Sequence, residues 1–299
     1  MGIWRALYLK YVMKWKRKLV LHMKANDNVD RLLNKLKEDS ARYKDLETWS
    51  YSSIEKKNAI RSLMNIRMPG AASNELLQLQ DRYLQEELSE KGIVTLSDIP
   101  TIKEQYGSLS PFAEKISLWQ GDITRLKVGA IVNAANSQML GCFVPCHRCI
   151  DNAIHSAAGI QLREECNHIM QERQIRYGRQ YEEPTGTATP TKGYNLPCDY
   201  VIHTVGPIVY DGVNDKLRQE LRNCYKSVLQ CCEENKIKSV AFCCISTGEF
   251  HFPNDEAAGI AMKTIVDFLK TNDNMERIIF NVFKDSDREI YEEKLKMHI

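Results

Sequence analysis

The chain lacks a net charge of any size. Among its 299 residues, 41 Lys and Arg stand against 39 Asp and Glu, which leaves a formal charge of +2. Bulk electrostatics therefore give no reason to expect nucleic-acid binding. With 43% hydrophobic and 27% charged residues, the composition is typical of a globular protein. The length suffices for one large domain with an appendage, or for two small domains.

Residues 1–24 lack acidic side chains and also lack a long apolar run. The second absence excludes a transmembrane span and a secretory signal core in this segment. Basic residues are interspersed with Trp4, Tyr8, Tyr11 and Trp15 at helical spacing. Three interpretations stay open: a helix lying on a membrane surface, an organelle-targeting segment, or an aromatic face packed on the main body.

Cysteine is plentiful, but the sequence does not favour a disulfide framework. The pairs Cys231-Cys232 and Cys243-Cys244 fall in helix-like and strand-like runs, where bridges are awkward. Reduced thiols in an intracellular compartment are the simpler interpretation, with the cytoplasm expected and organelle targeting by the basic N-terminus left open.

Four ligand-type side chains gather in one short stretch: Cys142, Cys146, His147 and Cys149 lie within eight residues. Thiolates and a neutral imidazole hold Zn²⁺ tetrahedrally. No second Cys/His pair stands at zinc-finger spacing elsewhere in the sequence, so a closed four-ligand structural site has no obvious completion. Three protein ligands with an open fourth position are typical of catalytic zinc. Reduced cysteines beside a core histidine are the alternative.

The chain divides into three parts. We predict a basic and aromatic helical segment over residues 1–50, a helical extension with its linker over 51–111, and an α/β domain over 112–299. Ser52 and Glu55 form a capping-box signal, and Ser73 can cap the next helix, which ends near Gly92. The stretch from Pro100 to Pro111 is the predicted linker between the helical extension and the α/β domain.

From Phe112 onward, short apolar runs alternate with helical patterns. The predicted strands are residues 116–119, 130–132, 200–205, 239–245 and 278–283. Such alternation predicts a three-layer α/β/α domain, in which ligands bind beyond the carboxyl ends of the strands. Three loops with conspicuous chemistry leave these ends: residues 120–123, 133–137 and 246–253.

Four motifs in order carry a family resemblance: Gln120–Thr124, Ile131–Ser137, Ala153–Gly159 and Ser246–Gly248. Together they resemble the macrodomain, an ADP-ribose-binding fold with a mixed central sheet, from Phe112 to the C-terminus. Where most macrodomains carry a glycine block between Leu140 and Asp151, this chain has the thiol and imidazole cluster. With the helical region in front, it is similar to the zinc-containing macrodomains of microbial sirtuin-linked operons, which are ADP-ribosyl hydrolases.

The resemblance implies a set of site residues. Asp122 and the Ile123 amide would contact adenine, although Asp122 can instead cap a turn. Asn136 would orient a ribose hydroxyl in the catalytic centre, while Asn133 braces the loop; for both, simple stabilisation of a turn is the alternative. Asp151 would lie near the scissile ribose as a catalytic carboxylate, or orient a metal ligand. Backbone amides would bind the diphosphate along Ser246, Thr247, Gly248, Glu249 and Phe250.

The same resemblance assigns the metal site and two further positions. Cys142, His147 and Cys149 would hold one Zn²⁺ per chain; Cys142, Cys146 and Cys149 are an alternative set. Phe283 would stack near adenine or belong to the core. His251 stands where most macrodomains have glycine.

The resulting expectation is a zinc-dependent hydrolase that removes mono-ADP-ribose from a modified protein side chain, with ADP-ribose as product. The resemblance implies an O-linked bond to an acidic side chain and, in operon relatives, a lipoylated carrier protein as substrate. Two alternatives are an ADP-ribose-binding reader with a structural zinc and a deacetylase acting on O-acetyl-ADP-ribose.

Overall fold

The computed structural model describes residues 27–298. The basic and aromatic pattern of the first 24 residues therefore lies outside the described part of the chain. Within residues 27–298, no helix is both long enough and apolar enough to cross a membrane.

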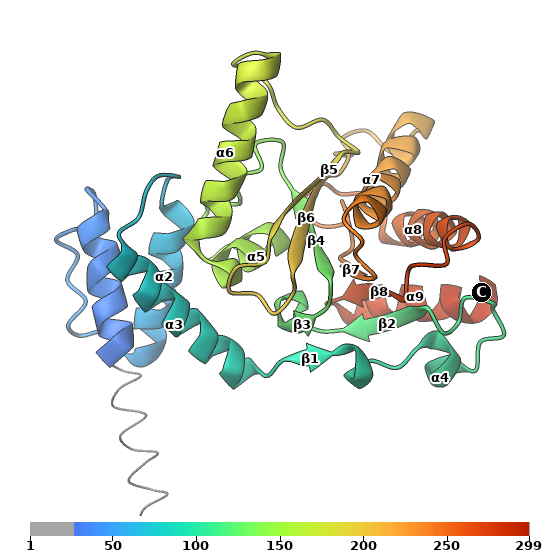
Figure 1. The fold of residues 1–299 in the computed structure, drawn as a ribbon, viewed down its shortest axis with the longest axis horizontal. Helices are drawn as coiled ribbons and strands as arrows, with labels where there is room; N and C mark the ends of the chain where they lie inside the picture. Colours follow the sequence, from blue (N-terminus) through green and yellow to red (C-terminus); the bar gives the residue numbers. More distant parts are fainter. Residues whose placement is uncertain (1–26, 299) are drawn as a thin grey trace, which may run out of the picture.

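A layer of helices precedes the α/β domain (Figure 1). Residues 27–39 are helical, and they are followed by α2 (Ser53–Ile66) and α3 (Asn74–Lys91). The predicted capping box is confirmed, since Ser52 N donates to Glu55 Oε2 at 2.7 Å and the Ser52 hydroxyl accepts from Glu55 N. Ser73 caps α3 as expected. Apolar residues of all three helices form a cluster of their own, which Ile160 of the α/β domain joins.

The predicted linker is more ordered than expected. After β1 (Val94–Thr95) and the 3₁₀ helix η1 (Leu96–Asp98), it contains the short helix α4 (Ile102–Tyr106). Thr101 caps this helix, and Gly107 ends it with a left-handed φ of 66°. Ile102 is fully buried in the main core, so the segment packs against the α/β domain instead of spanning open solvent.

The central sheet has six strands in the order β2-β8-β7-β4-β6-β5. Its strands are β2 (Ile116–Gln120), β4 (Ala130–Ala135), β5 (Ala188–Lys192), β6 (Tyr200–Val205), β7 (Ser239–Phe242) and β8 (Arg277–Val282). Five run parallel, and β5 pairs with β6 in the antiparallel direction, which confirms a mixed sheet. A separate short pair joins β1 to β3 (Leu126–Lys127). Strand β5 was not predicted; it carries Pro190, which an edge strand tolerates.

Helices cover both faces of the sheet (Figure 1). They are α5 (Ile150–Ala158), α6 (Ile160–Tyr177), α7 (Asp215–Glu234), α8 (Asn254–Leu269) and α9 (Asp285–His298). The chain crosses from β4 to β6 in one direction along the sheet and from β6 to β7 to β8 in the other. Because such crossovers are right-handed, α5 and α6 lie on the face opposite α7 and α8. The three-layer α/β/α prediction is confirmed.

The parallel strands bring four loops to one edge of the sheet. The carboxyl ends of β2, β4, β7 and β8 lead into residues 121–125, 136–149, 243–253 and 283–284. The predicted strand over 239–245 ends earlier, at Phe242, so Cys243 to Ile245 already belong to the loop. The predicted nucleotide-binding loops and the predicted metal ligands therefore converge on this edge, while the motif Ala153–Gly159 lies in α5 and at its C-cap.

Candidate active site

A cavity of about 1000 Å³ opens at the carboxyl edge of the sheet. The strand-end loops form one wall, and helices α2 and α3 of the extension form the other. Its lining joins all the predicted site residues to side chains of the extension: Lys57, Arg61, Tyr83, Glu87, Lys91, Asp122, Ile123, Asn136, Cys142, His147, Cys149, Asp151, Ser246, Thr247, Gly248, Glu249, Phe250 and Phe283. The extension is thus part of the site.

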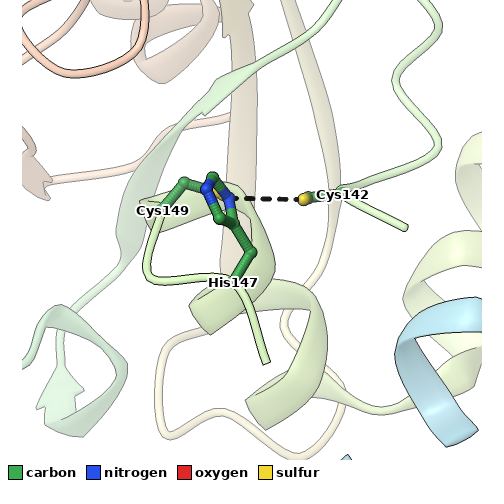
Figure 2. Close-up of side chains that lie close together, drawn as sticks. All are labelled: Cys142, His147 and Cys149. Atoms are coloured by element: carbon green, nitrogen blue, oxygen red, sulfur yellow. Dashed lines mark hydrogen bonds between the residues drawn. The ribbon is translucent and has the colours of Figure 1, made fainter. Parts of the chain in front are cut away.

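Three of the four ligand-type side chains between β4 and α5 meet in space (Figure 2). The ligand atoms of Cys142, His147 and Cys149 all lie within 4.8 Å of one another, and Cys142 Sγ is 3.6 Å from His147 Nδ1. Cys146 points elsewhere: its Sγ lies 3.3 Å from Ser62 Oγ and 3.5 Å from the carbonyl oxygen of Asn58. We call residues 141–149 the ligand loop.

The geometry of this trio fits a tetrahedral zinc ion. Zn–S bonds of about 2.3 Å and Zn–N bonds of about 2.0–2.1 Å at the tetrahedral angle separate a sulfur from a nitrogen by about 3.6 Å, the distance found between Cys142 and His147. Burial raises the pKa of the Cys149 thiol to about 12, so this thiol ionises only when a cation supplies opposite charge. The donor set suits zinc better than Mg²⁺ or Ca²⁺.

Local geometry explains how the ligand loop folds. Gly141 has a left-handed φ of 78°, and a Cβ there would lie 2.8 Å from the His155 ring, so only glycine fits. Cys149 is the N-cap of α5, where its Sγ accepts from Asn152 N at 3.4 Å. Asn152 is fully buried, and its Nδ2 donates to the carbonyl oxygens of Val144 and Cys142 at 3.0 and 3.4 Å.

Asp151 lies beneath the ligand loop in the first turn of α5. It is 5% exposed, and burial raises the pKa of its carboxyl group to about 6. Asn133 Nδ2 donates to its Oδ1 at 2.8 Å and Asn136 Nδ2 to its Oδ2 at 3.3 Å. Asn136 also accepts from Gln138 N, so it both shapes the turn after β4 and contacts the carboxylate. A carboxyl group with a pKa near neutrality can exchange a proton during a reaction.

Asp122 lines the cavity directly after β2. Its Oδ1 accepts from Thr124 N at 3.0 Å and from Thr124 Oγ1 at 2.6 Å, so it caps the 3₁₀ helix η2 (Ile123–Arg125). Its Oδ2 lies 3.6 Å from Lys91 Nζ, at the end of α3. Asp122 can therefore cap the turn with Oδ1 and still present Oδ2 to a ligand. Phe283 lies on the same rim and is 75% exposed, so the core alternative for this residue is wrong.

The loop between β7 and α8 contributes to the wall formed by the strand-end loops. Ser246 has a left-handed φ of 65°, and Phe252 N closes the turn by donating to Ser246 O at 3.0 Å. A Cβ on Gly248 would meet nothing within 4 Å, so the chain at Gly248 faces open space. His251 is exposed and keeps a left-handed φ of 56°, a conformation that glycine adopts more easily. Helix α8 begins at Asn254, directly after this loop.

Among residues 27–298, a second trio of ligand-type side chains is fully buried: His155, Cys166 and His203. Burial lowers the pKa of both histidines, that of His203 to about 3, so both are neutral. His203 Nδ1 lies 3.1 Å from Asn133 Nδ2, which leaves the ring proton on Nε2, 3.0 Å from Thr191 Oγ1. Both ring nitrogens of His203 are therefore engaged, whereas neither ring nitrogen of the buried His155 has a hydrogen-bond partner.

Four contacts at the site have no signature in the sequence. Arg61 reaches the ligand loop from α2, Lys91 reaches Asp122 from α3, Asn152 supports the loop from below, and Glu249 Oε1 lies 3.8 Å from His147 Nε2. The two residues of each contact are far apart in the chain or lack a helical or strand spacing, so no sequence pattern predicts that they meet. Glu249 was expected to act through its backbone; its side chain also faces a predicted metal ligand.

Known proteins are similar to this chain in sequence and in fold. The sequence profile of the Macro domain family matches residues 132–261. A protein of Treponema medium named protein-ADP-ribose hydrolase is 49% identical over 237 residues, which span 79% of this chain and 86% of the relative. A protein of the same name from Staphylococcus aureus is 44% identical over 236 residues, 79% of this chain and 83% of its own. A solved Trypanosoma brucei macrodomain in complex with ADP-ribose has a TM-score of 0.58 and 28% identity, and it covers 78% of this chain and 94% of its own. The chain belongs to the macrodomain family.

Proposed function

We propose that this protein is a zinc-dependent hydrolase that removes mono-ADP-ribose from modified protein side chains. One observation carries the proposal: the trio Cys142, His147 and Cys149 and the carboxyl group of Asp151 line the same cavity as Asp122 and the loop at Gly248. A nucleotide whose adenine lies at Asp122 and whose diphosphate lies at the Gly248 loop would place its distal ribose beside the trio and Asp151. The relatives named protein-ADP-ribose hydrolase support the reaction class.

In this proposal, each end of the ligand has its own partners. The Asp122 carboxylate and the Ile123 amide take the adenine, and Phe283 supplies an aromatic face. Backbone amides of Ser246 to Phe250 take the diphosphate, where Gly248 allows close approach. Asn136 orients a hydroxyl of the distal ribose.

The reaction proposed is cleavage of an O-linked bond between the ribose C1″ and an acidic side chain. The oxygen of water bonds to C1″, the C1″–O bond to the protein breaks, the carboxylate leaves on the protein, and Asp151 accepts the water proton. The raised pKa of Asp151 suits this exchange near neutral pH. Cys142, His147 and Cys149 would hold the zinc, which supplies a Lewis acid for water or for the ribose hydroxyls.

A comparison of binding and turnover tests the proposal. For wild type and Cys142→Ala, we would measure single-turnover release of ADP-ribose from aspartate/glutamate-linked protein, along with calorimetric binding of ADP-ribose. The proposal expects release to be lost in Cys142→Ala while most of the affinity remains, because Asp122 and the Gly248 loop hold the adenosine end. Serine-linked and arginine-linked substrates and O-acetyl-ADP-ribose serve as matched alternatives.

Two results would contradict the hydrolase. Wild-type protein that binds ADP-ribose but releases none from any linkage would be a reader. Joint loss of affinity, thermal stability and metal in Cys142→Ala would indicate a structural zinc that only maintains the loop.

A further inference from the structure

We propose that Arg61, in the helical extension, acts through Asn152 as a positioning residue for the three metal ligands. The inference rests on the proposed function, because it takes the Cys142, His147 and Cys149 trio as a zinc site. It adds a role for the extension, whose helix α2 would shape the ligand loop from outside the α/β domain.

Arg61 makes three hydrogen bonds across the boundary between the extension and the α/β domain. Its Nη2 and Nε donate to Asn152 Oδ1 at 2.7 and 3.2 Å, and Nη2 also donates to the carbonyl oxygen of His147 at 3.1 Å. The planar guanidinium can serve both acceptors at once because its donors form a rigid fork. One of these acceptors belongs to a predicted metal ligand.

The hydrogen bond from Arg61 to Asn152 also fixes the positions of Cys142 and Cys149, because Asn152 contacts both residues. Because Oδ1 accepts from Arg61, the amide must turn its Nδ2 toward the ligand loop, where it donates to the carbonyl oxygens of Val144 and Cys142. The backbone N–H of the same residue donates to Cys149 Sγ. Arg61 is therefore one or two hydrogen bonds away from all three ligands.

Neighbouring side chains on α2 hold the rest of the loop. Asn65 Oδ1 accepts from Cys146 N at 2.9 Å, and Ser62 Oγ lies beside Cys146 Sγ. Arg163 of α6 donates to the carbonyl oxygens of Asn65 at the end of α2 and of Leu140 before the loop, at 2.9 and 2.7 Å. The spare cysteine thus anchors the loop to α2, and a buried arginine fixes α2 against the α/β domain.

This arrangement has a measurable consequence for metal affinity. Groups that orient metal ligands without touching the metal typically change affinity about 10- to 100-fold when they are removed. A lysine at position 61 would keep the charge but could not serve Asn152 and His147 together, because an ammonium has no planar fork. We therefore expect Arg61→Lys and Arg61→Gln to weaken zinc binding about 10- to 100-fold.

The experiment uses the full chain and four proteins: wild type, Arg61→Lys, Arg61→Gln and the matched control Lys57→Ala. Lys57 lies one turn earlier on α2 and lines the same cavity, but its amine pairs with Glu87 and Glu90 on α3. Four quantities are measured: the zinc dissociation constant by chelator competition, the thiolate-to-metal absorption of Co²⁺-substituted protein, the affinity for ADP, and the melting temperature of metal-free protein.

The inference expects weaker zinc binding and altered Co²⁺ absorption in both Arg61 variants, with ADP affinity as in wild type and a loss of zinc affinity larger than any fall in metal-free stability. Lys57→Ala should keep the zinc affinity and the Co²⁺ absorption of wild type. Wild-type zinc affinity in both variants would overturn it. The inference would also be overturned if metal-free stability and ADP affinity fell as much as zinc affinity, since Arg61 would then serve only general folding. Wild-type protein that binds no zinc would refute the metal in the proposed function itself, which separates the two failures.

Discussion

Removal of the Asp122 carboxylate should weaken ADP-ribose binding without affecting the metal site. Asp122→Ala deletes an oxygen, Oδ2, that faces the cavity beside Lys91, and another, Oδ1, that caps η2 through Thr124. The first loss acts on the ligand and the second on the fold. The two effects can be separated because different oxygens carry them.

The expected magnitude follows from the exposure of the carboxylate. A charge-assisted hydrogen bond contributes about 1.5–3 kcal/mol. The Asp122 side chain is 35% exposed and already pairs with Lys91, so solvent screening and this existing partner reduce the loss to about 1–2 kcal/mol. The dissociation constant should rise about 5- to 30-fold.

Titration calorimetry with ADP-ribose measures this change, with Thr124→Val as the matched control. Thr124 is buried, and valine has its shape but lacks the hydroxyl that donates to Asp122 Oδ1. The control should lower the melting temperature and leave the affinity unchanged, while zinc content should stay constant in both variants. Wild-type affinity in folded Asp122→Ala would refute the reasoning and limit this residue to capping the turn.

Three further predictions concern the metal, the chemistry and the core. Cys149→Ala should empty the zinc site while Cys146→Ala retains the metal in elemental analysis; the reverse result would favour the alternative ligand set. Asp151→Asn should slow single-turnover release about 10²- to 10⁴-fold with ADP-ribose affinity retained, and an unchanged rate would remove this carboxylate from the chemistry. Burial lowers the pKa of His203 from 6.5 to about 3, so the folded state binds fewer protons than the unfolded state and loses stability as pH falls below 6.5. Denaturant unfolding should show wild type losing about 1.4 kcal/mol more per pH unit than His203→Gln between pH 6 and 4, whereas equal slopes would contradict the buried neutral histidine.

The strands that carry the site were predictable because their physical signals are local. Near-continuous apolar runs such as Ala130–Val132 and Ile278–Phe280 are typical of parallel strands buried on both faces, and they form β4 and β8. The caps at Ser52 and Ser73 are equally local, since each serine bonds a backbone amide three residues ahead. Strand β5 was missed because its sequence, with a central proline, becomes a strand only beside β6.

The sequence by itself determined that thiols and an imidazole lie between β4 and α5, because their order in one loop requires no knowledge of distant contacts. Only the tertiary structure decided which of them face one another. Cys146 has a left-handed φ of 52° and is held by Asn65, 81 residues earlier, so it turns away from the trio. The Arg61–Asn152 bond spans 91 residues, and no periodicity in the chain encodes such a pair. Helical and strand patterns report which face of an element is apolar, whereas the meeting of two polar side chains depends on how whole elements pack.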